Sequence, residues 1–309
     1  MGCPAVLYRK ETGKEKENTM DIRLIAMDLD GTLLMEDHMH ISGRNLAALR
    51  SASDRGIRLA IASGRTYAGL SDTIAQLTFA DYALISNGAA AVDVKTKETL
   101  FYEGIPYEKW IQVYDIMKKY HILFEIYANG KSYMEREYFD CYENDMLSRE
   151  FVERLKARIL PVEDGKKALY GQSVEKICSL ATDPMNAPKA LAELERLGGL
   201  AFTSSIPGNL EINRENTNKG NALRALCRRL GIGPEQVMAF GDAGNDLEML
   251  SFAGWSFAMG NATEEARAAA KYVTGTNARD GVAQAVEAAQ SGELLDFCRR
   301  GTAGKSIDK

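Results

Sequence analysis

Short apolar runs alternate with helical patterns toward both ends of this chain. Runs at 22–27 and 57–62 predict strands, and the segment between them predicts a helix that begins after Ser42 and ends before Gly56. The same alternation predicts strands at 82–86, 237–240 and 255–259 and helices at 66–77, 219–230, 246–252 and 264–270. Strands that alternate with helices form a parallel sheet with helices on both faces. We therefore expect an α/β fold whose core is a Rossmann-like, doubly wound parallel sheet.

The middle of the chain has a different pattern. Apolar runs come in pairs there, and Asn129-Gly130 between two of them predicts a β-hairpin. A chain of 309 residues also exceeds the roughly 250–300 residues that one hydrophobic core organises. We therefore expect an inserted α+β domain that interrupts the core. The expected organisation is a disordered extension at 1–19, a core formed by 20–89 and 207–290, an inserted domain at 90–206 and a C-terminal tail at 291–309.

Charge and cysteine content restrict the partners and the location. There are 38 Lys and Arg against 43 Asp and Glu, a net charge of −5, so no positive field favours nucleic acid. No apolar run approaches the ~20 residues that span a membrane. The five cysteines are scattered without a C-x-x-C pair, which is typical of reduced cytoplasmic thiols. We expect a cytoplasmic protein that binds neither nucleic acid nor membrane, and no pattern in the sequence indicates its oligomeric state.

Two aspartates follow the first predicted strand. Asp28 and Asp30 stand two residues apart in the run Asp28-Leu-Asp30-Gly-Thr32. Carboxylates this close at the end of a buried strand repel each other unless a cation or a proton offsets their charge. The run favours a functional site, while a solvated turn that merely contains acids explains an isolated D-x-D about as well.

Three other segments bring polar groups to the same edge of the expected sheet. They are Ser63-Gly-Arg65 after the second strand, Lys219 at a helix start, and Gly241-Asp242-Ala-Gly-Asn245-Asp246 after a later strand. Each has an ordinary alternative: an N-cap for Ser63, a surface charge for Lys219 and a helix N-terminal acid for Asp246. Oxygen ligands without a nearby His or Cys favour Mg²⁺ over Zn²⁺. A phosphate dianion would approach these acids only if Mg²⁺ and Lys219 balance the charge.

In this order, the four motifs resemble those of the haloacid dehalogenase superfamily, and specifically its Cof-type phosphatases with a type II cap. The resemblance covers about residues 21–290, and an insertion between the second and third motifs agrees with such a cap. It implies Mg²⁺-dependent hydrolysis of small phosphorylated metabolites, such as sugar phosphates or phosphorylated cofactors. It also implies that Asp28 is the nucleophile, which forms an aspartyl-phosphate, and that Asp30 is the general acid and base, held by Thr32. A general acid at Asp30 needs a raised pKa or a proton held by geometry.

The resemblance further implies which residues bind the metal and the phosphate. Mg²⁺ would be bound by Asp28, the backbone carbonyl of Asp30 and Asp242, with Ala243 and Asp246 near them. Phosphoryl oxygens would be held by the Leu29 amide, Ser63, Gly64, Lys219 and Asn245, as a preorganised charge clamp. Arg65 and Asn87 are expected to support these groups.

Substrate specificity is expected to lie within the inserted domain, because type II caps close over the site and contact the leaving group. The candidates flank the predicted hairpin and are Glu125, Tyr127, Tyr133, Glu135 and Arg136. A solvated strand face is the alternative for each of them. The three histidines, His38, His40 and His121, are scattered and are expected at the surface.

Two other functions remain open. A phosphomutase of the same superfamily would transfer a phosphoryl group between positions of a sugar and would depend on a bisphosphate activator. A receiver-like signalling module also groups acids, a hydroxyl and a lysine on an α/β sheet. It fits poorly, because this chain has a second lobe and places its acid pair after the first strand as D-x-D-G-T.

Overall fold

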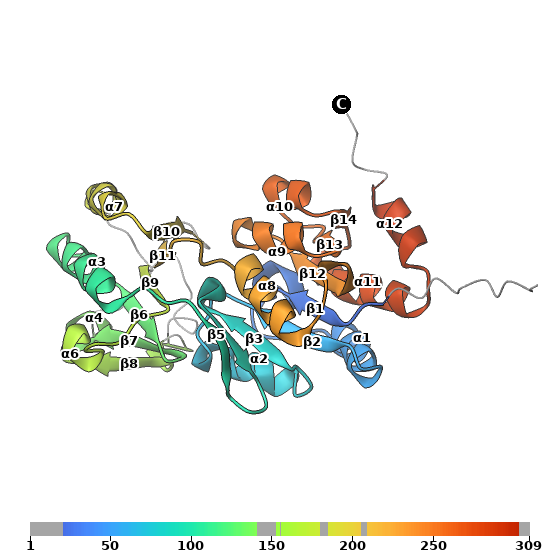
Figure 1. The fold of residues 1–309 in the computed structure, drawn as a ribbon, viewed down its shortest axis with the longest axis horizontal. Coiled ribbons are helices and arrows are strands. Elements are labelled where there is room, and N and C mark those ends of the chain that lie inside the picture. The colour runs from blue at the N-terminus through green and yellow to red at the C-terminus, as the bar shows by residue number, and fades with distance from the viewer. Residues whose placement is uncertain (1–20, 141–152, 155, 180–184, 205–208, 303–309) are drawn as a thin grey trace, which may run out of the picture.

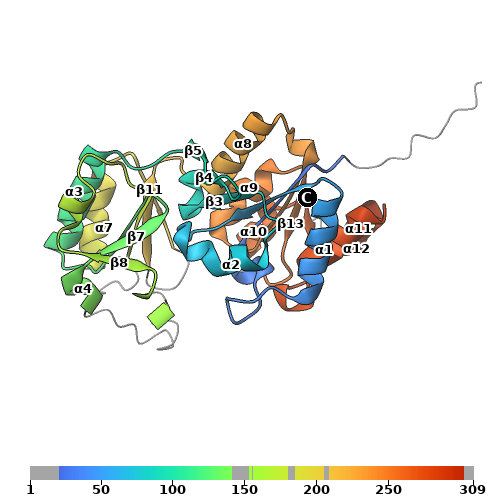
Figure 2. The ribbon, with the colours of Figure 1, turned by 90° about the horizontal axis from the view of Figure 1, so that it is seen from below.

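The computed structural model describes residues 21–140, 153–154, 156–179, 185–204 and 209–302. The extension predicted at 1–19 lies outside these residues. The described residues form two β-sheets with their helices, which lie side by side along the long axis of the molecule (Figures 1 and 2). Within the described ranges, no helix is long and apolar enough to cross a membrane.

The larger sheet has eight strands in the order β14-β13-β12-β1-β2-β3-β4-β5. The strands from β14 to β3 are parallel, whereas β4 and β5 pair antiparallel with their neighbours. The expected parallel core sheet is therefore confirmed. Its strands are β1 (Leu24–Met27), β2 (Arg58–Ala62), β3 (Tyr82–Ile85), β4 (Ala90–Asp93), β5 (Thr99–Tyr102), β12 (Val237–Gly241), β13 (Trp255–Ala258) and β14 (Tyr272–Val273).

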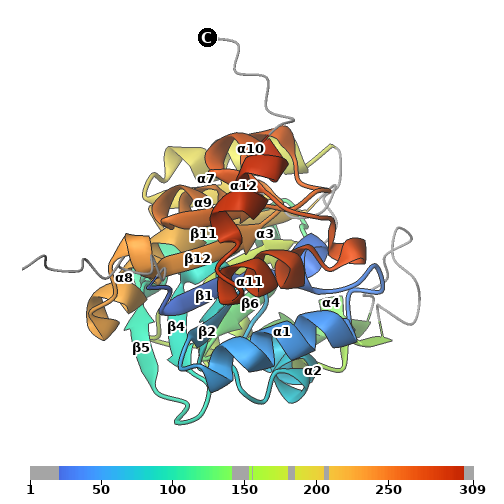
Figure 3. The ribbon, with the colours of Figure 1, turned by 90° about the vertical axis from the view of Figure 1, so that its right-hand side faces the viewer.

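Helices cover both faces of this core sheet. They are α1 (Gly43–Asp54), α2 (Ser71–Gln76), α8 (Lys219–Leu230), α9 (Leu247–Phe252), α10 (Glu264–Ala269), α11 (Gly281–Gln290) and α12 (Leu294–Thr302). Ile25 and Met27 of β1 pack with α1 and α11, whereas Leu24 and Ala26 point to the other face and pack with α8. Figure 3 shows α1, α11 and α12 together on the near side of the sheet. All four β1 residues are buried, as in a central parallel strand.

Capping residues begin α1 and α8, and a glycine ends α8, where the sequence predicts. The side chain of Ser42 accepts a hydrogen bond from an amide in the first turn of α1 (3.1 Å), and Asn218 accepts one in the first turn of α8 (2.7 Å). Gly231 ends α8 in the left-handed conformation, with a φ of 66°. The Asn218 cap fixes Lys219 as the first residue of α8.

We call the smaller sheet and its helices the cap. Its strand order is β10-β11-β9-β6-β7-β8, and its pairs are antiparallel except β7 with β8. Asn129 and Gly130 join β6 to β7 with φ angles of 52° and 70°, as in the predicted hairpin. The strands are β6 (Glu125–Ala128), β7 (Lys131–Glu135), β8 (Ile159–Val162), β9 (Lys176–Ser179), β10 (Leu200–Thr203) and β11 (Leu210–Arg214). The helices of the cap are α3 (Tyr107–Lys119), α4 (Arg136–Asp140), α6 (Gly165–Ala168) and α7 (Ala187–Arg196). Its apolar core includes Trp110 of α3, Leu194 of α7 and Ile177 of β9.

The strand pairing corrects the expected limits of the inserted domain. The sequence predicts that 90–206 are inserted, but β4 and β5 extend the core sheet from β3. It assigns 207–290 to the core, but β11 belongs to the cap sheet. A local apolar pattern shows that a strand forms but not which sheet it joins, which explains both errors. The chain leaves the core after β5 and returns after β11, where Thr217 Oγ1 donates to the Glu103 carbonyl (3.2 Å).

Two predicted segments also differ in their secondary structure. The helix predicted at 66–77 is a short 3₁₀ turn, Ala68–Leu70, followed by α2. The tail predicted from residue 291 contains α12, whose Leu294 and Cys298 are buried against the core. These two residues are four apart, so they lie on one face of the helix, and that face packs on the sheet.

Candidate active site

The predicted motifs meet at the carboxyl ends of three neighbouring strands. Asp28 follows β1, Ser63 follows β2 and Asp242 follows β12, and these strands are adjacent in the core sheet. Asp246 ends a short 3₁₀ turn, Gly244–Asp246, after β12. One carboxylate oxygen from each of Asp28, Asp242 and Asp246 lies within 4.8 Å of the others. The fold thus brings acids from distant parts of the sequence into one cluster.

Lys219 is the buried counterion of this acid cluster. Its Nζ donates to Asp28 Oδ1 (2.6 Å) and to Asp246 Oδ1 (2.7 Å), and its side chain is 0% exposed. These two ion pairs offset the helix dipole, which disfavours a cation in the first turn of α8. One ammonium beside three carboxylates still leaves an excess of negative charge.

Burial and this excess of negative charge raise the pKa values of two of the acids. Burial raises the pKa of Asp28 well above its usual range; Lys219 opposes the rise, and the charges of Asp246 and Asp242 add to it. Burial, together with the charge of Asp246, raises the pKa of Asp242 to about 6. Clustered carboxylate oxygens that are unfavourable as anions fit a hard divalent cation such as Mg²⁺. The donor set is therefore compatible with the expected metal.

The turn after β1 brings the first motif against Asp242. Leu29, whose amide is an expected phosphate donor, begins this turn and is buried. Thr32 Oγ1 donates to Asp242 Oδ1 (2.8 Å), whereas the resemblance implies that Thr32 holds Asp30. Gly31 has a φ of 79°, and a Cβ placed on it would lie 2.3 Å from Asp242 Oδ2. Any side chain at position 31 would displace the Asp242 carboxylate.

Asp246 holds the loop that follows β12. Its Oδ2 accepts hydrogen bonds from the amides of Asp242 (2.9 Å) and Ala243 (3.1 Å), while its Oδ1 pairs with Lys219. Protein groups therefore engage both oxygens, and this favours a supporting role for Asp246. Asn245 is half-buried in the same turn, and its side chain makes no hydrogen bond to a described residue.

Asp30 faces two basic side chains. Arg65 donates from Nη2 to Oδ1 (2.6 Å) and from Nε to Oδ2 (3.2 Å), and His38 Nδ1 lies 3.0 Å from Oδ1. Burial acts to raise the pKa of Asp30, but the His38 hydrogen bond and the Arg65 charge outweigh burial, so this pKa is lowered. The contact with Asp30 in turn raises the pKa of His38. Of the two conditions named for a general acid, the raised pKa is therefore not found at Asp30. No pattern in the sequence indicates that His38 contacts Asp30.

Ser63 and Gly64 are held between the core sheet and the cap. The Oγ of buried Ser63 accepts a hydrogen bond from the Arg65 amide (3.2 Å). The Ser63 carbonyl accepts one from the amide of Asn87, which follows β3 (3.1 Å). The Gly64 carbonyl accepts one from Nζ of Lys176, the first residue of β9 (2.8 Å). A cap strand thus contacts the second motif directly.

Asn87 leads into a cluster of buried polar side chains between core and cap. Its Nδ2 donates to Glu211 Oε2 (2.6 Å) and Asn213 Oδ1 (3.2 Å), both on β11. Its Oδ1 is buried and has no hydrogen-bond partner among the described residues. Glu211 Oε1 lies 3.2 Å from Lys176 Nζ. These three cap residues are not predicted from the sequence. The available signal was Lys176 directly before the apolar Ile177 and Cys178, and Glu211 and Asn213 alternating with apolar residues of β11.

Two of the predicted specificity residues lie inside the cap. Glu125 accepts a hydrogen bond from Ser132, and Glu135 accepts one from the Gly165 amide (2.9 Å). Both glutamates are buried, so the alternative of a solvated strand face is wrong for them. Burial raises the pKa of Glu125 to about 7, against the hydrogen bond from Ser132 and the charge of Lys176.

The other three predicted specificity residues lie in different surroundings. Tyr133 packs on the apolar core of the cap, and Arg136 pairs with the exposed Glu163. The ring of Tyr127 lies 4.8 Å from Lys176 Nζ. Of the five candidates, Tyr127 thus contacts the lysine that reaches the second motif.

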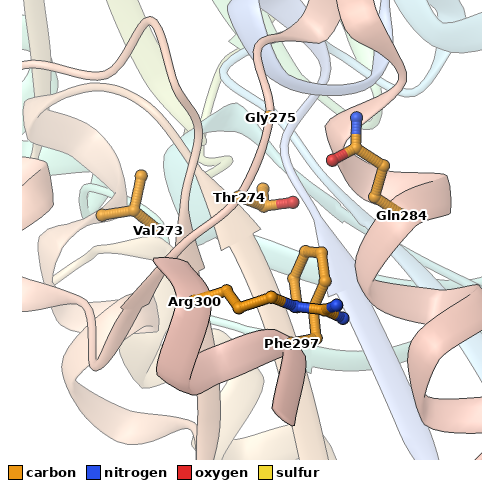
Figure 4. A pocket seen from close by; sticks show the side chains of 6 residues that line it. All are labelled: Val273, Thr274, Gly275, Gln284, Phe297 and Arg300. Carbon is orange, nitrogen blue, oxygen red and sulfur yellow. The ribbon is translucent and has the colours of Figure 1, made fainter. Parts of the chain in front are cut away.

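A pocket of about 430 Å³ lies apart from these motifs, beside the last strand of the core sheet. Its lining consists of Val273, Thr274, Gly275, Gln284, Phe297 and Arg300. Figure 4 shows Phe297 and Arg300 of α12 on one side of the pocket and Gln284 of α11 on another. None of the predicted motif residues lines it. The pocket therefore carries no part of the candidate site.

Comparisons with known proteins identify relatives along most of the chain. A family model described as haloacid dehalogenase-like hydrolase matches residues 25–286. The 5-amino-6-(5-phospho-D-ribitylamino)uracil phosphatase YcsE of Bacillus subtilis (strain 168) is 31% identical over 268 residues, which cover 86% of this chain and 95% of that protein. An HMP-PP phosphatase of Escherichia coli O6:H1 is 32% identical over 256 residues, which cover 80% of this chain and 87% of that protein. Among solved structures, a haloacid dehalogenase-like hydrolase from Bacteroides thetaiotaomicron matches with a TM-score of 0.74 at 32% identity, covering 86% of this chain and 98% of that one.

Proposed function

Because the chain belongs to the haloacid dehalogenase-like hydrolases, and is a phosphatase among them, we propose that it hydrolyses small phosphomonoesters with Mg²⁺ through an aspartyl-phosphate. The observation that carries this proposal is the buried ion pair between Lys219 and Asp28, beside Asp242 and Asp246. A nucleophilic carboxylate meets a phosphate dianion only where positive charge offsets their repulsion. Lys219 supplies part of that positive charge. The carboxylates that Lys219 does not neutralise would bind a cation, and that cation would supply the rest.

Asp28 is the proposed nucleophile. Its Oδ1 accepts a hydrogen bond from Lys219, and its Oδ2 accepts none from a described residue, so Oδ2 is the oxygen that bonds to phosphorus. Attack forms the aspartyl-phosphate and breaks the bond to the leaving oxygen, which takes a proton from Asp30. Water then attacks phosphorus, gives a proton to Asp30, and releases phosphate and the Asp28 carboxylate.

The surroundings of Asp30 suit the second of these steps most directly. A lowered pKa keeps Asp30 ionised, and an ionised carboxylate accepts a proton from the attacking water. Arg65 engages both carboxylate oxygens and fixes their orientation. The first step needs the protonated acid. A phosphoryl group that draws Arg65 toward itself would remove one of the two contacts that lower this pKa.

Mg²⁺ would be held by the carboxylates of Asp28 and Asp242 and by the backbone carbonyl of Asp30. When bound, it would offset the negative charge of both the acids and the phosphoryl group. Asp246 supports this site by holding Lys219 and the loop after β12. The phosphoryl oxygens would be held by the Leu29 amide, Ser63, Gly64, Lys219 and Asn245.

The proposed substrate is a small metabolite with a polar leaving group. Two relatives with about the same sequence identity are named for 5-amino-6-(5-phospho-D-ribitylamino)uracil and for HMP-PP, both small phosphorylated compounds. Buried carboxylates, amides and an ammonium lie where cap meets core, and such groups favour a leaving group that forms hydrogen bonds. The cytoplasm is the proposed location, in keeping with the reduced, buried thiols of Cys178 and Cys227.

The test is a panel of phosphorylated metabolites, assayed for phosphate release with Mg²⁺ and with excess chelator. We expect hydrolysis with Mg²⁺ and its loss in chelator, and we expect Asp28→Asn to abolish turnover while far-UV circular dichroism stays unchanged. Activity that persists in chelator would refute the metal role, and undiminished turnover by Asp28→Asn would remove Asp28 as nucleophile. Transfer of the phosphoryl group between sugar positions, dependent on a bisphosphate, would identify a mutase instead.

A further inference from the structure

Lys176 is a cap lysine whose ammonium is buried against the core. Its side chain is 2% exposed, and its Nζ lies 2.8 Å from the Gly64 carbonyl oxygen and 3.2 Å from Glu211 Oε1. The ring of Tyr127 lies 4.8 Å from the same Nζ. Glu211 lies on β11 and Tyr127 on β6, so the lysine contacts both strands that neighbour β9, as well as the second motif of the core.

Burying this charge is costly, and stability alone gives no reason for it. An ammonium loses its hydration on burial, and pairs such as Lys176 with Glu211 are often no more stable than apolar residues of the same volume. Glu211 is itself held by Asn87 Nδ2 (2.6 Å). A buried cation that points at a candidate phosphate-binding turn, in a place where apolar packing would cost less, favours a role in that turn.

The contact continues from Lys176 to Ser63 through a single peptide group. The carbonyl of Gly64 and the amide N–H of Arg65 belong to the same peptide unit, and that N–H donates to Ser63 Oγ (3.2 Å). An ammonium at the carbonyl end polarises the peptide and strengthens the N–H as a donor. Because Ser63 Oγ accepts this hydrogen bond, the hydroxyl hydrogen of Ser63 points away from the Arg65 amide. No described residue accepts a hydrogen bond from that hydroxyl.

Other hydrogen bonds dock the cap on the same part of the core. The amide of Ala68 donates to the Gly130 carbonyl at the hairpin turn (2.8 Å). Ser86 Oγ donates to Glu175 Oε2 (2.7 Å), and Asn213 Nδ2 donates to the Ser86 carbonyl (3.0 Å). These contacts keep β9 in a fixed position relative to the turn that carries Ser63.

We propose that Lys176 is a positioning residue for phosphate binding: through the Gly64–Arg65 peptide it directs the Ser63 hydroxyl toward the phosphoryl group. Strand β9 of the cap is then part of the phosphate-binding apparatus as well as the cover over the leaving group. This inference rests on the proposed function, in which Ser63 holds a phosphoryl oxygen.

A double-mutant cycle with Ser63→Ala tests the proposal, because a residue that acts through Ser63 loses its effect when the hydroxyl is absent. We expect Lys176→Met to lower kcat/KM by about 10- to 100-fold and to weaken competitive inhibition by orthophosphate to a similar degree. In the Ser63→Ala background, the same substitution is expected to change both values less than about threefold. An equal loss in both backgrounds, or no loss in either, would overturn the proposal.

Lys118→Met is the matched control. Lys118 is another cap lysine in a carboxylate pair, with Glu135 Oε2 at 2.7 Å. Its side chain is partly buried, and the contacts given for it lie within the cap. We expect it to leave orthophosphate inhibition unchanged even if it lowers the melting temperature as much as Lys176→Met. Equal weakening of phosphate binding by both variants would show that loss of cap stability, and not positioning, is responsible.

Two further measurements separate the possible failures. If Lys176→Met does not fold, the cycle is run with Lys176→Arg, which keeps a charged donor in altered geometry; equal effects with and without Ser63 again count against the proposal. If the wild type hydrolyses no ester of the panel, the proposed function fails. Calorimetric titration of orthophosphate in the presence of Mg²⁺ then still tests Lys176, and equal affinity of the wild type and Lys176→Met would overturn its role.

Discussion

At the scale of single residues, Lys219 determines whether the acid cluster is tolerated in the fold. Its ammonium pairs with Asp28 and Asp246, and all three side chains are almost completely buried. Removing one partner from a buried ion pair leaves uncompensated charge, which usually costs more than the pair contributes. The same residue would balance the incoming phosphate. Under the proposed function, stability and catalysis would therefore both depend on the charge of Lys219.

Lys219→Met is expected to impair both properties. We expect the free energy of unfolding to fall by about 3–5 kcal/mol, because two carboxylates lose their counterion. We expect kcat to fall by at least about 100-fold, because a preorganised charge is lost from the reacting centre. Urea unfolding and phosphate release measure the two effects. Lys95→Met, which removes an exposed lysine paired with Asp81, is the control and is expected to change neither; a Lys219→Met enzyme with normal kcat would contradict this role.

At the scale of elements, the β6–β7 hairpin does more than join two strands. Its turn residue Gly130 has a φ of 70°, and a Cβ placed there would lie 2.9 Å from Tyr67 Cβ in the core. Position 130 therefore requires glycine for two reasons: its left-handed backbone conformation, and its close approach to the segment after the second motif.

Gly130→Ala is expected to cost more than the same change at Gly171. Both glycines belong to the cap and have a φ of 70°, but no atom lies within 4 Å of a Cβ at position 171. Gly171→Ala should therefore lose only the backbone term of about 1 kcal/mol, and Gly130→Ala should lose about 1–3 kcal/mol more through the clash with Tyr67. Urea unfolding of both variants measures the difference. Equal losses would show that the hairpin does not press on the core.

A buried carboxyl on β6 gives the cap a pH dependence. The pKa of Glu125 is raised from 4.5 to about 7, so the folded state binds more protons than the unfolded state between these values. The free energy of unfolding therefore decreases as the pH rises through this interval, by up to about 3 kcal/mol. Glu125→Gln, which mimics the protonated acid, is expected to match the wild type near pH 4.5 and to be more stable near pH 8.

Urea unfolding at the two pH values checks the Glu125 prediction. Glu163→Gln is the control, because it removes an exposed carboxylate of the same part of the molecule. Its effect on stability is expected to be the same at both values. A Glu125→Gln variant whose stability differs from that of the wild type by the same amount at both pH values would contradict the predicted titration.

At the scale of the whole molecule, we expect the acid cluster to tie the stability of the core to a divalent ion. Asp28 and Asp242 carry raised pKa values, so a cation that binds them relieves repulsion in the folded state alone. Ligand that binds only the folded state at 100 times its dissociation constant stabilises it by about 2.7 kcal/mol. We expect MgCl₂ to raise the melting temperature relative to chelator, and Asp242→Asn to lose most of this increase. Asp37→Asn, which removes an exposed acid paired with His40, should retain it. An equal increase in all three proteins would exclude Asp242 as a ligand.

Sequence analysis predicts the core of this molecule better than the contact between its two sheets. Asp28, Ser63 and Asp242 are predictable because each follows an apolar run, and parallel strands present their carboxyl ends at one edge. Lys176 and Glu211 are not, because their pairing depends on the alignment of β9 with β11, which no local pattern specifies. His38 contacts Asp30 from a loop in which its own backbone is left-handed, with a φ of 57°. Neither a hydrophobic period nor the neighbouring residues in the sequence indicate that contact.

The two crossings between the core and the cap lie one hydrogen bond apart, at Glu103 and Thr217. A segment whose ends are neighbours can be exchanged for another of different length or shape without altering the path of the remaining chain. Substrate preference can thus diverge during evolution while the chemistry stays fixed. If Lys176 positions Ser63 as proposed, any replacement would have to supply a new donor to the Gly64 carbonyl oxygen.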